Sequence, residues 1–81
     1  MKEYYLKPIF DNCKSFYGKA TVKASDDYNT LILWSYLTKV AEIADGQAKV
    51  IDTFSRHIKE FLKQNGFKAE TKAQIKKDYM I

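Results

Sequence analysis

The sequence has 81 residues, which suits one domain and is too short for two. Hydrophobic residues make up 46% of the chain and aromatic residues 15%, enough to build a packed core, and this excludes an intrinsically disordered protein. The formal net charge is +4, and the whole excess lies in residues 53–81, so we expect any anionic partner to meet the last third of the chain.

The first two thirds of the chain, residues 4–52, are predicted to form about four antiparallel strands in a meander. Residues 4–10 are aromatic and apolar, and Pro8 among them favours an edge or end position. Residues 15–24 alternate between apolar and polar side chains, the period of a half-buried strand. Gly18 indicates a bulge in this strand or the close approach of another backbone.

The next segment, residues 30–43, is rich in β-branched and aromatic residues. It is predicted as one long strand with an irregularity near residues 37–39. Asp45 and Gly46 favour a type I′ hairpin turn, and residues 47–52 return as the partner strand.

The last third is predicted to be helical, with a first helix over residues 54–65. Thr53 or Ser55 provides its N-cap. Gly66 fits the left-handed position just past the helix, and Phe67 follows at a position where it can contact the last turn. The residues expected on the apolar face are Phe54, Ile58, Phe61 and Leu62.

A second short helix is predicted over residues 72–80, because Thr71 and Gln74 match the capping-box spacing. Ile75 and Tyr79 would form its apolar side. The expected fold class is therefore α+β, with an antiparallel meander packed against a C-terminal helix and a second short helix.

Residues suited to catalysis or to binding a metal are scarce. Cys13 and His57 are the only cysteine and histidine, too few ligands for a structural zinc site, and Cys13 lies in a polar turn without the surroundings of a nucleophile. His57 borders the apolar side of its helix, where a packing role with one hydrogen bond is expected. A Gly18–Lys19 pair lacks the rest of a phosphate-binding loop. We therefore expect no enzymatic activity, cofactor or metal.

The basic residues of the helical third form the main candidate site. Arg56, Lys59 and Lys63 fall at i, i+3 and i+7 of the first helix, opposite its apolar residues. Further basic residues follow them in the turn and the second helix: Lys68, Lys72, Lys76 and Lys77. This basic ridge suits nucleic-acid phosphates, although a solvated lysine face on an amphipathic helix is equally compatible with it.

An aromatic surface is the second candidate. Tyr17 lies beside Lys19 and Lys23 on the face of the second strand predicted to point away from the core. Proteins that bind single strands use basic aromatic sheet faces for base stacking. Tyrosine is also an ordinary residue of half-buried strands, so the same pattern fits plain sheet structure.

The expected location is the cytoplasm. A single cysteine fits a reducing compartment better than secretion. The N-terminus has no apolar run of signal-peptide length, and the longest apolar run, residues 31–34, is far too short to span a membrane.

Residues 14–20, 35–41 and 56–67, taken in this order, resemble a family of small uncharacterised domains from phages and mobile elements of low-GC bacteria. The resemblance covers most of residues 4–80 and implies a bacterial cytoplasm and a role beside the DNA or RNA machinery. It brings no catalytic residues. The expected function is a non-catalytic binding module that acts on nucleic acid or on a bacterial protein that handles it. The alternative is a stoichiometric inhibitor of a bacterial nuclease defence, similar to the anti-CRISPR proteins.

Overall fold

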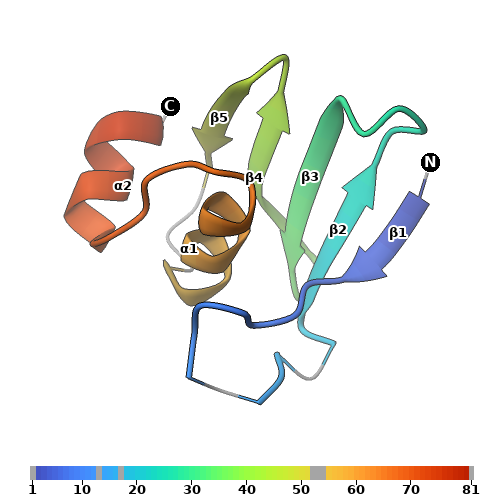
Figure 1. Cartoon of the computed structure of the whole chain (residues 1–81), viewed down its shortest axis with the longest axis horizontal. Coiled ribbons are helices and arrows are strands. Elements are labelled where there is room, and N and C mark those ends of the chain that lie inside the picture. The colour runs from blue at the N-terminus through green and yellow to red at the C-terminus, as the bar shows by residue number, and fades with distance from the viewer. Residues whose placement is uncertain (1, 13, 17, 52–54, 81) are drawn as a thin grey trace.

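The computed structural model of the chain describes residues 2–12, 14–16, 18–51 and 55–80. Five strands are followed by two helices (Figure 1). The strands are β1 (Lys2–Tyr5), β2 (Ala20–Ala24), β3 (Thr30–Ser35), β4 (Thr38–Ala44) and β5 (Gln47–Val50). The helices are α1 (Ser55–Gln64) and α2 (Lys72–Tyr79). This confirms the predicted α+β class.

The strands form one antiparallel sheet in the order β1-β2-β3-β4-β5, a meander as predicted. The sheet has five strands instead of about four, because residues 30–43 form two strands. Ser35 pairs directly with Thr38, so Tyr36 and Leu37 make a two-residue turn where we expected an irregularity within one strand. Tyr36 adopts a φ of 56°, which a non-glycine residue seldom does.

The second hairpin turn follows the prediction. Asp45 and Gly46 have φ angles of 53° and 75°, the positive pair that a type I′ turn requires. Ala44 pairs with Gln47 across this turn. The local Asp-Gly signal was therefore sufficient here.

The two N-terminal strands are shorter than predicted. β1 ends at Tyr5, before Pro8, and β2 begins at Ala20 instead of residue 15. Gly18 lies outside the strands with a φ of 74°, and the Lys19 N–H donates to the Phe16 carbonyl (2.9 Å) across a turn. Gly18 was expected to mark a bulge or the close approach of another backbone; it lies in a turn instead, and the atoms near its Cβ position belong to the Tyr5 side chain.

A register shift does occur in the sheet, between β3 and β4. It lies at Leu33 and Trp34, opposite two successive buried residues, Val40 and Ala41. An extra residue on one strand of an antiparallel pair increases the local twist of the sheet. The extra residue lets two neighbouring side chains of β4, those of Val40 and Ala41, both face the core.

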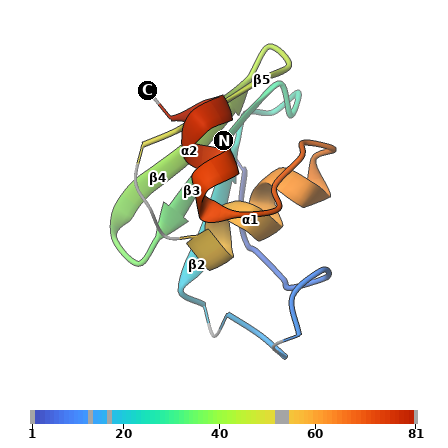
Figure 2. The ribbon, with the colours of Figure 1, turned by 90° about the vertical axis from the view of Figure 1, so that its left-hand side faces the viewer.

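The helices pack on one side of the sheet (Figures 1 and 2). α1 contacts β3, and α2 contacts β5. The main core residues from the strands are Ala20, Val22, Leu33, Val40, Ala41 and Val50; those from the helical part are Ile58, Phe61, Leu62, Ala69 and Ile75. Alternate strand residues, such as Ile32 and Trp34, are only half-buried, and no described helix covers their face of the sheet.

The end of α1 has the predicted capping geometry. The Phe67 N–H donates to the Leu62 carbonyl (2.9 Å), and the Gly66 N–H donates to the Lys63 carbonyl (3.2 Å). Gly66 has a φ of 83°. These two bonds and the left-handed glycine form a Schellman motif. The start of α1 cannot be compared in the same way, because Thr53 and Phe54 lie outside the described residues.

The start of α2 matches the prediction in part. The Thr71 hydroxyl accepts a hydrogen bond from the Gln74 N–H (3.1 Å), as an N-cap should. The Gln74 side chain returns to the N–H of Glu70 (2.8 Å), one residue earlier than in a standard capping box. Within the described ranges no helix is long and apolar enough to cross a membrane.

Candidate functional site

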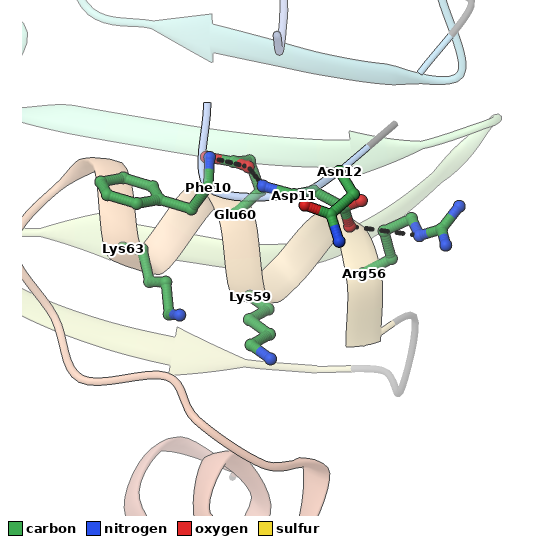
Figure 3. Close-up of a pocket in the computed structure, with 7 residues that line it drawn as sticks. All are labelled: Phe10, Asp11, Asn12, Arg56, Lys59, Glu60 and Lys63. Atoms are coloured by element: carbon green, nitrogen blue, oxygen red, sulfur yellow. Dashed lines mark hydrogen bonds and ion pairs between the residues drawn. The ribbon is translucent and has the colours of Figure 1, made fainter. Parts of the chain in front are cut away.

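A pocket of about 200 Å³ lies where the segment after β1 runs along α1 (Figure 3). Its lining comes from two parts of the chain far apart in sequence. The loop provides Phe10, Asp11 and Asn12, and α1 provides Arg56, Lys59, Glu60 and Lys63. The pocket therefore gathers the three α1 residues of the predicted basic ridge.

Glu60 fixes the loop against the helix. Its Oε1 accepts hydrogen bonds from the Phe10 N–H (2.9 Å) and the Asp11 N–H (3.0 Å). Its Oε2 accepts one from Gln64 Nε2 (2.8 Å), which also donates to the Lys7 carbonyl (2.6 Å). Glu60 is only 2% exposed, and a buried carboxylate is stable when N–H donors surround it in this way.

Sequence reasoning missed Glu60 as a site residue. Its donors lie 49 and 50 residues away, so no local pattern shows the contact. The one local signal is its place directly before Phe61 and Leu62, two residues of the buried face of α1. Glutamate is almost never fully buried without a partner, so a glutamate beside buried residues indicates one.

The charges of the pocket are partly paired. Arg56 Nε lies 3.2 Å from Asp11 Oδ2, with the arginine side chain 65% exposed. An ion pair this exposed contributes little to stability and can be exchanged for another anion at small cost. Lys63 Nζ lies 6.0 Å from the centre of the Phe10 ring. Three bases and two acids line the pocket, which leaves a formal net charge of +1.

The other predicted basic residues lie elsewhere. Lys68, Lys72 and Lys76 are exposed on the segment after α1 and on α2, and none of them lines the pocket. Lys19 lies outside β2, and its Nζ is 5.8 Å from the Tyr36 ring centre at the β3–β4 turn. The structure thus divides the predicted basic ridge into a group at the pocket and a group on the C-terminal segment.

Of the three residues predicted on the aromatic face of the second strand, only Lys23 lies within β2. Tyr17 lies outside the described residues, and Lys19 precedes the strand to which we assigned it. The open face of the sheet does carry an aromatic and a base, because Lys23 Nζ lies 4.6 Å from the centre of the Trp34 ring. At this distance the ammonium group is attracted to the indole face, and Trp34 is half-buried.

His57 is a packing residue, as its position on the helix predicted. It is buried, its Nδ1 lies 2.8 Å from Ser35 Oγ, and its ring meets the Phe16 ring edge-on at 4.8 Å. Burial chiefly lowers the pKa of His57, and Arg56 and Lys19 lower it further while Asp11 raises it. The neutral ring is therefore favoured at pH 7. Cys13 lies outside the described residues.

No group of three or more histidine, cysteine, aspartate or glutamate side chains that could hold a metal ion occurs among the described residues. The acids nearest the pocket, Asp11 and Glu60, bind protein donors instead. Three basic residues line the pocket, of which Arg56 is exposed while Lys59 and Lys63 are half-buried, and their charge suits an anion.

A search of protein families finds one whose model matches residues 4–77, described as a family of unknown function (DUF8033). No curated protein and no solved structure matches the chain significantly. The match spans most of the chain, including most of the sheet and of both helices. The chain belongs to this family of unknown function, DUF8033.

Proposed function

We propose that the protein is a non-catalytic module that binds nucleic-acid phosphates through the pocket beside α1. The observation that carries the proposal is the row of Arg56, Lys59 and Lys63 along one side of the pocket. The loop on the other side is held in place by Glu60. The proposal includes the context that the family resemblance implied, a phage or mobile-element protein acting in the bacterial cytoplasm.

The spacing of the three basic side chains suits contact with a nucleic-acid backbone. Arg56 and Lys63 are seven residues apart, about 10 Å along a helix. Lys59 lies between them, and Lys59 and Lys63 project from the same side of α1 (Figure 3). A short stretch of phosphate backbone can therefore lie along the helix, with the Arg56 guanidinium exchanging Asp11 for a phosphate.

Affinity of this kind carries little sequence information. Phosphate contacts position a protein on nucleic acid, and base contacts specify the sequence. The pocket has one arginine and two lysines, and lysine acts as a point charge instead of a bidentate reader. We therefore propose a binder of low sequence preference.

The test is the salt dependence of binding to a labelled oligonucleotide, measured by fluorescence anisotropy. Affinity should fall steeply with salt, and the triple change of Arg56, Lys59 and Lys63 to glutamine should reduce the slope by roughly one unit for each phosphate that is no longer neutralised. The matched control changes the same number of charges outside the pocket, at Lys68, Lys72 and Lys76. A protein that binds no oligonucleotide at physiological ionic strength would refute the proposal.

A second candidate is a stoichiometric inhibitor of a bacterial nuclease, and exposed apolar side chains favour it. Leu37 at the β3–β4 turn is 93% exposed, and Tyr36 and Ile9 are exposed as well. Adjacent exposed apolar side chains can mark an interaction site, and tyrosine is enriched among interface hot spots. A nuclease that co-purifies with the protein after all nucleic acid is digested, that loses its activity at one equivalent of the protein, and that no longer co-purifies with Leu37→Asp would support this function.

A further inference from the structure

Phe10 is exposed although the backbone beneath it is fixed. The residue is 58% exposed, while its N–H donates to the buried carboxylate of Glu60 (2.9 Å). Phe10 is not among the residues of the hydrophobic core. The ring is thus held at the surface, at the wall of the pocket and outside the core, where a ligand can reach it.

The surroundings of the ring suit one kind of ligand. Phe10 lines the same pocket as the three basic residues of α1, and Lys63 Nζ lies 6.0 Å from the centre of the Phe10 ring (Figure 3). Proteins that bind single strands combine a basic groove for the backbone with an aromatic ring on which a base stacks. A duplex keeps its bases stacked inside, so its base faces cannot reach such a ring.

We propose that the pocket selects single-stranded over double-stranded nucleic acid, with Phe10 stacking one base while Arg56, Lys59 and Lys63 contact the phosphates. This inference rests on the proposed function, because it assigns the substrate class of the same site. Glu60 is a positioning residue in this arrangement: it contacts no ligand but holds the backbone of Phe10 and Asp11.

Asp11 limits the affinity of the site. Its carboxylate occupies the Arg56 guanidinium and brings a negative charge to the pocket. Because a phosphate must displace this carboxylate, Asp11→Asn should tighten oligonucleotide binding, and the gain should shrink as salt rises.

The first experiment compares an unlabelled single strand of thymidines with a duplex of equal length as competitors for a labelled single strand. We expect the single strand to compete better, and Phe10→Ala to weaken single-strand binding at least about five-fold, since one stacked base contributes about that much. The matched control is Tyr28→Asn in the β2–β3 turn, which should leave binding unchanged. It removes an exposed ring whose centre lies 4.8 Å from Lys2 Nζ. Asparagine suits the positive φ of that position.

The second experiment detects the stack directly. Phe10→Trp should bind as well as the wild type, and its fluorescence should be quenched by the thymidine strand. Wild-type fluorescence comes from Trp34 in β3, outside the pocket, and should not change. Equal competition by single strand and duplex, with no effect of Phe10→Ala, would overturn the stacking inference and leave phosphate binding standing. The absence of binding to either competitor would overturn both.

Discussion

His57 is a histidine whose environment favours the neutral ring. Burial is the main cause of its lowered pKa, with Arg56 and Lys19 acting in the same direction. The unfolded chain therefore takes up a proton at about pH 6.5, where the folded protein does not. The free energy of unfolding should fall as the pH drops below 6.5. The contribution of His57 to this fall should end once the pH is below the pKa of His57 in the folded protein.

The measurement is the urea midpoint of the wild type and of His57→Gln at pH 7.5 and pH 5.5. Carboxylates contribute to the pH dependence of both proteins, so the difference between the two isolates the histidine. We expect the wild type to lose more stability than the variant over this range. An equal loss in both proteins would show that His57 is protonated as readily in the folded state as in the unfolded state.

Gly66 is the second residue whose local geometry permits a quantitative prediction. Gly66→Ala should destabilise the protein by about 1 kcal/mol, because a side chain is forced into the left-handed region at a φ of 83°. A Cβ at this position would meet no atom within 4 Å, so backbone strain is the whole cost. Gly66→Asn should cost less, since asparagine tolerates this region. Equal denaturation midpoints for all three proteins would contradict the Schellman geometry.

Among the elements, the loop before β2 depends on one side chain of α1. Glu60→Ala removes the acceptor of the Phe10 and Asp11 N–H groups, and hydrogen bonds to a buried charge contribute about 2 kcal/mol each. We expect these two amides to lose protection in hydrogen exchange while the amides of β2–β4 keep theirs. Glu70→Ala, which changes an exposed glutamate, is the control. Unchanged protection at Phe10 and Asp11 in Glu60→Ala would mean that another contact holds the loop.

The elements that could be predicted from sequence are those with local chemical signals. Asp45 and Gly46 supplied the residues that a type I′ turn needs, and Gly66 marked the end of α1. The β3–β4 turn was missed because Tyr36 is a typical strand residue, Leu37 is not a turn residue, and Tyr36 adopts its positive φ without a glycine. There the pairing of Ser35 with Thr38 determines the turn, which is a property of the two strands together.

At the scale of the whole molecule, the asymmetry of charge was visible in the sequence but its geometry was not. The bases of the last third do not form one continuous surface at the pocket, because Lys68, Lys72 and Lys76 lie on the next segment. The pocket exists only because a loop from the start of the chain lies along α1, held by Glu60. These contacts join a loop to a helix across about fifty residues, and they leave no periodic trace in the sequence.

The central claim, that nucleic acid binds at the pocket beside α1, is tested most directly by an NMR titration of the amide signals with a short thymidine strand. We predict that the largest shifts fall on residues 10–12 and 56–63 and that they diminish as salt is raised. Shifts confined to α2, or to the sheet face that carries Lys23 and Trp34, would contradict the account, since those surfaces lie outside the pocket.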